Sequence, residues 1–399
     1  MVVNYKKKTI EQVDVTGKRV FVRADLNVPL DDRQQITNDR RVRASVPTLK
    51  YLLDQGAAVI VASHLGRPKG VRKPEMSLKP VADRLGELLG RSVQMAPDCI
   101  GEQVEKMASA LKGGQVLMLE NVRFHAEETK NDEAFAGHLG ALAEVYVNDA
   151  FGTAHRAHAS TEGITKHMHP CVAGYLISKE LQYLGEALAN PKRPLLAILG
   201  GAKVGSKIGV ITSLMKLVDH LVIGGGMAYT FLKVQGFEIG ASLFDEESAD
   251  TARQIIEQAD QAGIKLWLPV DCLVADKIDA SAQTKVVDAR QIPAGWMGVD
   301  AGPRTIEQIE QLVAEAKTVM WNGPVGIFEQ APFAGGTKAV GQALAKADAL
   351  TILGGGETAM AAEQFGVDHQ MSHVSTGGGA SLEFLEGKQL PGILALDDA

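Results

Sequence analysis

Cationic or hydrogen-bonding side chains follow the short apolar runs in the first half of the sequence. These positions are Arg23, Asp25, Asn27, His64, Arg67, Asn121, Arg123, Asn148 and Asp149, with Arg41, His155, Arg156 and His158 in later loops. A polar residue after a single strand commonly only solvates a loop, but the repetition favours a shared purpose. Arginines that meet in one place repel one another unless an anion holds them, and their planar fork suits carboxylate and phosphate. The first half is therefore predicted to cradle a small polyanion.

The second half ends its apolar runs in glycine instead. The glycines stand at residues 200–201, 224–226, 354–356 and 377–379, each before helix-forming sequence. Glycine lets backbone N–H groups approach phosphate oxygens, and a helix N-terminus adds a positive dipole end. Tight turns or close strand–helix packing explain any single run equally well. Four runs in one half favour an extended phosphate ligand.

Two lysines and one carboxylate accompany these glycines. Lys203 and Lys207 stand four residues apart, on one face of a helix if a helix begins there. One cation would reach a moving phosphoryl group and the other the phosphates of a nucleotide, with a pair of solvated lysines as the alternative. Glu357, beside the glycines at 354–356, could hold Mg²⁺ near the phosphates.

Three motif-like patterns do not qualify as sites of their own. GGGETA at 354–359 fits a dinucleotide fingerprint, but the required acidic residue at the end of a second strand is missing. GGAKVGSK at 200–207 lacks the Gly-Lys-Ser/Thr ending of a phosphate-binding P-loop. His155 and His158 have the spacing of a helical metal pair, but no thiolate accompanies them and the local charge is positive.

The segments that position these residues alternate between strand and helix along the whole chain. Continuous apolar runs such as RVFVRADL and PLLAILGG, separated by helical-period segments, are typical of parallel sheets covered on both faces. Ligands bind beyond the carboxyl ends of such strands. Pro191 and Pro194 follow a helical segment and predict a boundary between two lobes near residues 180–193. The apolar tail LPGILALDDA is expected to dock on a surface.

Composition excludes several classes of protein. The chain has 399 residues, 45% of them hydrophobic, which fits a folded protein of two or three domains. A formal charge of -7 argues against nucleic acid or an anionic membrane as a partner. The three cysteines are too dispersed for a disulfide framework, and neither a secretory signal nor an apolar span of about 18 residues is found. A cytoplasmic protein is expected, for which a monomer suffices.

The two kinds of strand end together predict phosphoryl transfer between a nucleotide and a small anion. Such chemistry needs in-line positioning and charge neutralisation more than a covalent nucleophile. An oxidoreductase that uses a nicotinamide cofactor is the nearest rival, and it depends on GGGETA and the sheet pattern alone. A non-catalytic anion or nucleotide sensor is a second rival, but Arg41, Lys203 and Lys207 are all present.

The order of the motifs resembles one family. VRADLNVP, SHLGRP, ENVRFH, VNDAFGTAHRAH, GGAKVGSKI, IGGGMAYTFLK, WMGVDAGP, WNGPVGIFE, GTKA and VSTGGGASLEFLEG are similar to phosphoglycerate kinase from about residue 18 onward. The resemblance implies reversible phosphoryl transfer between 1,3-bisphosphoglycerate and ADP, which gives 3-phosphoglycerate and MgATP. It also implies an α/β fold of two hinged, Rossmann-like three-layer lobes with parallel sheets, with the C-terminal tail packing back on the first.

The resemblance further implies a division of labour. Residues 1–182, with the tail 385–399, would form the phosphoglycerate-binding domain, 183–193 a linker helix and hinge, and 194–384 the nucleotide-binding domain. The phosphoglycerate site would be Asp25, Asn27, Arg41, His64, Leu65, Gly66, Arg67, Arg123 and Arg156. The nucleotide site would be Gly201, Ala202, Lys203, Lys207, Gly298, Asn322, Glu329, Gly355, Gly356, Glu357 and Thr358. The catalytic group would be Arg41, Lys203, Lys207 and Gly378, the last within the glycines at 377–379.

One position departs from the family. The metal ligand is usually Asp, and here it is Glu357, which keeps the charge on a longer arm.

No general base is expected, because the acceptor is a carboxylate that is already ionised at neutral pH. Sites on two lobes must close together for reaction, so the segments 180–193 and 376–379 are the predicted hinges.

Overall fold

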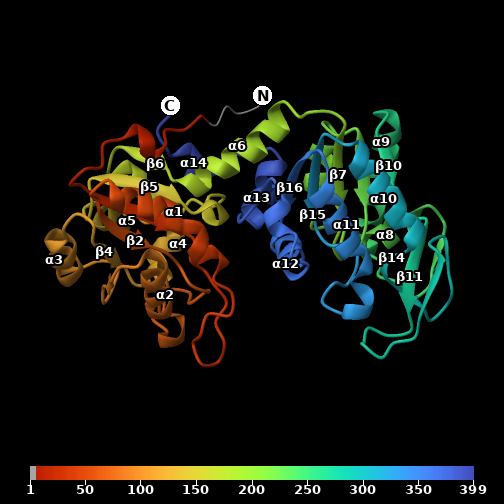
Figure 1. Cartoon of the computed structure of the whole chain (residues 1–399), viewed down its shortest axis with the longest axis horizontal. Coiled ribbons are helices and arrows are strands. Elements are labelled where there is room, and N and C mark those ends of the chain that lie inside the picture. The colour runs from red at the N-terminus through yellow and green to blue at the C-terminus, as the bar shows by residue number, and fades with distance from the viewer. Residues whose placement is uncertain (1–5) are drawn as a thin grey trace. The chain divides into compact units, whose positions relative to one another are not determined.

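The computed structural model describes residues 6–399 and divides the chain into two compact units. Unit 1 joins the chain up to Gln182 with Gln389–Ala399, and unit 2 is Tyr183–Lys388. Figure 1 draws unit 1 mainly in red to yellow and unit 2 in green to blue. No helix of the described residues is long and apolar enough to cross a membrane.

Unit 1 is built on a six-stranded sheet in the order β3-β4-β2-β1-β5-β6, and every pairing in it is parallel. Its strands are β1 (Arg19–Ala24), β2 (Ala58–Ala62), β3 (Val93–Met95), β4 (Val116–Met118), β5 (Val145–Asp149) and β6 (Cys171–Ala173). Its helices are α1 (Arg40–Asp54), α2 (Lys79–Leu89), α3 (Glu102–Ala110), α4 (Ala126–Lys130), α5 (Glu133–Gly140) and α14 (Pro391–Leu394).

The core of unit 1 explains why its strands are continuously apolar. Val20 and Val22 of β1 point to the face that packs against Leu49 and Leu52 of α1. Phe21, which points to the opposite face, is also fully buried. Because both faces are covered, alternation of polar and apolar residues is absent, and the predicted three-layer parallel arrangement is confirmed.

Unit 2 repeats this architecture with the strand order β10-β8-β7-β15-β16-β17, again with every pairing parallel. The strands are β7 (Leu195–Leu199), β8 (His220–Ile223), β10 (Lys265–Trp267), β15 (Thr318–Asn322), β16 (Leu350–Gly354) and β17 (His373–Val374). The helices are α7 (Ile208–Leu214), α8 (Met227–Val234), α9 (Ala249–Gln261), α10 (Pro303–Glu315), α11 (Gly335–Lys346), α12 (Gly356–Gln364) and α13 (Gly379–Leu385).

Unit 2 also carries smaller sheets. Strands β11 (Asp271–Ala275), β12 (Thr284–Asp288) and β14 (Met297–Ala301) pair antiparallel, and β9 (Glu238–Ile239) pairs parallel with β13 (Gln291–Ile292). This antiparallel sheet was not predicted from the sequence, because β11 has a buried apolar run like that of a parallel strand and β12 is largely exposed.

Helix α6 (Tyr175–Ala189) contains the boundary between the units, and the tail belongs to unit 1. The Asn148 side-chain amide donates to the backbone oxygen of Gly392 at 2.9 Å, and the Asp397 N–H donates to the Cys171 oxygen at 2.9 Å. Figure 1 shows blue α14 beside the strands of unit 1. The expectation that the tail packs on the first lobe is confirmed.

Candidate active site

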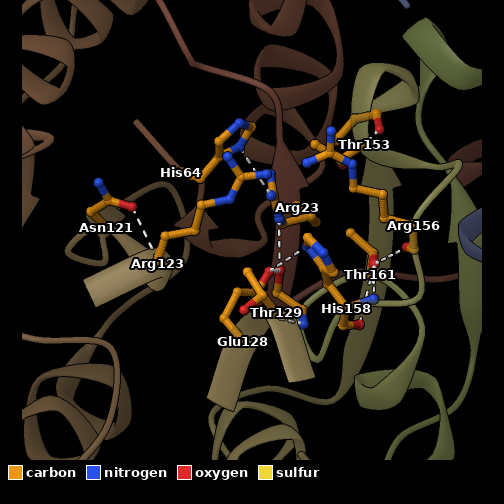
Figure 2. Close-up of polar contacts among 12 residues, drawn as sticks. Arg23, His64, Asn121, Arg123, Glu128, Thr129, Thr153, Arg156, His158 and Thr161 are labelled. Carbon is orange, nitrogen blue, oxygen red and sulfur yellow. Dashed lines mark hydrogen bonds and ion pairs between the residues drawn. The ribbon is translucent and has the colours of Figure 1, made fainter. Parts of the chain in front are cut away.

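Arg23 lies at the centre of the polar residues of unit 1. It stands near the carboxyl end of β1 and is fully buried. Its Nε donates to Ser160 Oγ at 2.8 Å, and its Nη2 lies 3.3 Å from Nδ1 of His64, which follows β2. Figure 2 shows this contact, with the side chains of Arg123 and Arg156 in the same region.

The loop after β1 organises a second part of this cluster. Arg41, near the start of α1, donates to Asp25 Oδ1 at 3.0 Å and to the backbone oxygen of Asn27 at 3.2 Å. The Asn27 side-chain oxygen in turn accepts from the Gly66 N–H at 2.8 Å. The structure therefore brings these four predicted residues together.

Arg123 contributes a buried cation with one unused donor. It lies in the short helix η3 (Val122–Phe124), and its Nη1 donates to the Gly66 oxygen at 3.0 Å. Its Nε is buried and has no hydrogen-bond partner among residues 6–399. Burial, together with the nearby charges of Arg23 and Arg156, lowers the pKa of Arg123 to about 10. An anion bound beside Arg123 would accept a hydrogen bond from its Nε and would favour its charged form.

The two buried histidines of this region are neutral at pH 7. Burial, and then the charges of Arg23, Arg123, Arg41 and His158, hold the pKa of His64 well below its usual range. Burial and the neighbouring arginines lower the pKa of His158 to about 4. The positive charge of the cluster therefore resides on its arginines.

Three further residues of the predicted phosphoglycerate site make none of the hydrogen bonds described above. Arg67 is exposed and makes no hydrogen bond or ion pair within residues 6–399. Arg156 is exposed, and its Nε donates to His155 Nε2 at 3.0 Å. Leu65 is buried and contributes its backbone oxygen, which accepts from the Asn121 amide at 2.7 Å.

Sequence reasoning missed Glu128 and Ser160. Glu128 belongs to α4, and its carboxylate is fully buried and accepts hydrogen bonds from Ser160 N at 2.9 Å and Ser160 Oγ at 2.7 Å. The segment AEETK has the composition of a solvated helix, so no local signal marks Glu128 as buried.

In unit 2, Lys207 and Asn322 form a polar pair. The Lys207 ammonium contacts the side-chain oxygen of Asn322, at the end of β15, and lies 3.4 Å from its backbone oxygen. Burial lowers the pKa of Lys207 to about 8, an effect opposed by the carboxylate of Glu357. The buried Asn322 Nδ2 has no hydrogen-bond partner.

The expected helical face that joins Lys203 to Lys207 is wrong. Helix α7 begins at Ile208, so both lysines lie in the preceding loop. Gly201 at the start of this loop has a φ of +115°, which is incompatible with an α-helix at that residue. Lys203 is exposed, as is its neighbour Ala202.

Two of the glycine runs serve close packing of backbones. A Cβ at Gly200 would lie 2.1 Å from the Pro324 oxygen, and one at Gly225 would lie 2.7 Å from the Gly201 nitrogen. The alternative of close packing therefore accounts for these two glycines. A Cβ at Gly356 would meet nothing within 4 Å.

The other two runs open helices at the carboxyl ends of β16 and β17. Gly355 precedes α12 with a φ of +89°, and Gly378 precedes α13 with a φ of +52°. Thr358, in the first turn of α12, is buried and accepts a hydrogen bond from the Gly323 N–H at 2.7 Å. N–H groups in the first turn of a helix that lack an intrahelical partner are the donors that a phosphate requires.

Glu357 has a carboxylate with the chemistry and the exposure of a magnesium ligand. It is exposed in the first turn of α12, and its carboxylate makes no hydrogen bond or ion pair within the described residues. Mg²⁺ prefers oxygen ligands and commonly takes one or two carboxylates together with substrate phosphates.

Two further predicted residues are not joined to this group by any contact within residues 6–399. Gly298 lies in β14 and donates its N–H to Ser242 Oγ at 2.9 Å. Glu329 is exposed in the loop after β15.

Another set of potential metal ligands lies in unit 1. Asp98, Cys99 and His125 bring their ligand atoms within 4.8 Å of one another. These side chains make hydrogen bonds with each other or with the backbone. His125 Nε2 lies 2.6 Å from Asp98 Oδ1, and the Cys99 thiol donates to the backbone oxygen of Glu120 at 2.9 Å. The three side chains therefore already have hydrogen-bond partners within the protein.

One α/β unit with a cluster of arginines, and a second with a lysine and helix N-termini at its strand ends, fit a phosphotransferase. The family model "Phosphoglycerate kinase" matches residues 10–388. The cytosolic phosphoglycerate kinase of Triticum aestivum is 59% identical over 394 residues, which are 98% of each chain. The cytosolic phosphoglycerate kinase 3 of Arabidopsis thaliana is 56% identical over 98% of each chain. The structure of phosphoglycerate kinase from Coxiella burnetii matches with a TM-score of 0.89 and 42% identity, and covers 98% of each chain.

The chain belongs to the phosphoglycerate kinase family. Its activity is the reversible transfer of a phosphoryl group between the acyl phosphate of 1,3-bisphosphoglycerate and ADP, which yields 3-phosphoglycerate and ATP. The predicted function is confirmed, and the nicotinamide oxidoreductase is excluded as its alternative.

Proposed function

We propose that the arginine cluster of unit 1 binds the acid substrate. Arg123 carries this assignment: it is a buried cation beside other cations, and its Nε has no hydrogen-bond partner among the described residues. Guanidinium groups bind phosphate and carboxylate through paired hydrogen bonds. The binding residues would be Asp25, Asn27, Arg41, His64, Leu65, Gly66, Arg67, Arg123 and Arg156.

The nucleotide would bind in unit 2. Lys207 would contact its phosphates, and the N–H groups at the start of α12 would hold phosphate oxygens. Glu357 would hold Mg²⁺, which when bound supplies positive charge that neutralises the phosphates. The full set would be Gly201, Ala202, Lys203, Lys207, Gly298, Asn322, Glu329, Gly355, Gly356, Glu357 and Thr358.

Transfer itself would depend on positioning and charge. Arg41 and Lys203 would neutralise the moving phosphoryl group, and Gly378 would present the N-terminal end of α13 to it. The acceptor carboxylate is already ionised, so no residue needs to remove a proton from it.

The reaction requires both substrates to meet, so we propose that the units close around segments 180–193 and 376–379. Residues 1–182 with the tail 385–399 would be the phosphoglycerate-binding domain, 183–193 the linker, and 194–384 the nucleotide-binding domain. Small-angle scattering should record compaction when both substrates are present. An unchanged radius of gyration would contradict closure.

We propose further that the protein acts as a cytoplasmic monomer, without nucleic-acid or membrane partners. The cytosolic names of two relatives support the location, and the net negative charge supports the absence of those partners.

The magnesium assignment is tested by turnover at varied Mg²⁺ concentration. The assay couples ATP formation from the acyl phosphate and ADP to a spectroscopic signal. Glu357→Ala should raise the Mg²⁺ concentration needed for half-maximal rate, whereas Glu357→Asp should keep the wild-type requirement. An unchanged Mg²⁺ dependence in Glu357→Ala would remove this residue from the metal site.

A further inference from the structure

A continuous chain of hydrogen bonds joins Glu128 to His64 in unit 1. Ser160 donates both its N–H and its Oγ–H to the Glu128 carboxylate, at 2.9 and 2.7 Å. A hydroxyl has one hydrogen, so Ser160 Oγ accepts from Arg23 Nε at 2.8 Å. The other end of the Arg23 guanidinium lies 3.3 Å from His64 Nδ1 (Figure 2).

This chain determines which nitrogen of His64 carries the proton. A guanidinium has donors but no acceptor, and it stays charged in proteins. Facing Arg23, Nδ1 of a neutral His64 must therefore accept, which leaves the ring proton on Nε2. Nε2 makes no hydrogen bond within residues 6–399. We propose that Glu128 is a positioning residue that, through Ser160 and Arg23, fixes His64 as the tautomer whose Nε2–H is offered to the substrate.

Glu128 is required because Arg23 is buried among cations. A fully buried guanidinium is strongly unfavourable without a compensating negative charge. The groups that face this region from neighbouring elements include Arg123, which is a second positive charge, and His158, which is neutral at pH 7, so neither can compensate the charge of Arg23. Glu128 is fully buried, lies 3.8 Å from His158 Nδ1, and raises the pKa of Arg123 against the effect of burial.

The consequence is a donor that does not titrate. The charged groups acting on His64 are Arg23 from β1, Arg41 from α1, Arg123 from η3, and His158 when protonated. All of them oppose protonation of the ring. His64 would therefore supply a directed, neutral N–H at neutral pH. Its use by the substrate rests on the proposed function, whereas its tautomer does not.

The tautomer can be read from the ¹⁵N chemical shifts of His64 in protein without substrate. The signals are assigned by their loss in His64→Gln and followed from pH 5.5 to 8.5. We expect an unprotonated shift for Nδ1, a protonated shift for Nε2, and no titration near pH 6.5. A protonated Nδ1 in the wild-type protein would overturn the proposal.

The relay is tested by Glu128→Gln and by the double variant Arg23→Met/Glu128→Gln. The double variant removes both buried charges together, so that it folds where a single change leaves one charge unpaired. Both should show mixed His64 tautomers: the double variant removes the donor that faces Nδ1, and Glu128→Gln removes the carboxylate that, through Ser160, holds Arg23 against Nδ1. Glu127→Gln, an exposed neighbour on α4, is the matched control and should retain the wild-type signals. A wild-type tautomer in either test variant would overturn the proposal.

Kinetics separate this inference from the function proposed for His64. In the double variant we expect KM for 3-phosphoglycerate to rise at least about threefold, with kcat changed by less than about twofold. Mixed tautomers with a wild-type KM would support the relay and remove His64 from the substrate site. A wild-type tautomer would refute the relay whatever the value of KM.

Discussion

The pKa of Lys207 predicts how the rate should depend on pH. Its ammonium is charged below its pKa of about 8 and neutral above it. If the charge binds nucleotide phosphates, kcat/KM for the nucleotide falls as pH rises through that value. The charged fraction drops from about 0.9 at pH 7 to about 0.1 at pH 9, since each unit changes the ratio tenfold. A roughly tenfold loss in kcat/KM between these values is therefore expected.

Lys207→Arg supplies the comparison, because arginine stays charged throughout this range. Its kcat/KM should start lower, since a guanidinium does not reproduce the contact with Asn322, but should stay level from pH 7 to 9. The coupled assay is run with nucleotide below KM, so that it reports the free enzyme. A flat profile in the wild-type protein, or the same decline in Lys207→Arg, would refute the role of this ammonium.

Three other substitutions test the site and the packing. Arg41→Ala should raise the activation free energy for kcat/KM by about 2.7–4 kcal/mol. The control Lys50→Ala, at an exposed position on the same helix, should leave kcat/KM unchanged. A loss of kcat/KM below about threefold in Arg41→Ala would exclude Arg41 from catalysis. Gly200→Ala should lower the free energy of unfolding by about 1–3 kcal/mol in urea titrations, because its Cβ would overlap a backbone oxygen, whereas Gly185→Ala, which meets nothing, should be neutral or stabilising. Burial raises the pKa of Asp149 to about 7. The pKa of this group in the unfolded chain is near 4, so its ionisation lowers the free energy of unfolding as pH rises from about 4 to 7. Asp149→Asn should therefore be more favourable relative to wild type at pH 8 than at pH 5, and equal differences at both values would exclude that ionisation as the cause.

The parallel sheets could be predicted because burial on both faces leaves a direct mark in the sequence. Strands such as β1 and β7 are short, their central residues are apolar and buried, and polar or glycine residues stand at or after their carboxyl ends. The antiparallel strand β12 escaped prediction because it is largely exposed and its residues resemble a loop.

The candidate site was predictable only where residue type and strand end coincide. His64 and Arg123 follow strands, and the structure brings them near the Arg23 guanidinium. Glu128 was missed because a buried carboxylate and an exposed one look alike in sequence. Only the fold brings Ser160 to it from 32 positions further along the chain. The assigned binding roles themselves stay predictions.

The division of unit 1 into two stretches of chain has a consequence for biosynthesis. Residues 389–399 are translated after all of unit 2, yet their backbone bonds belong to unit 1. Unit 1 therefore cannot complete its backbone hydrogen bonds until the whole of unit 2 has been translated. A nonsense codon near position 389 would damage the half that is made first.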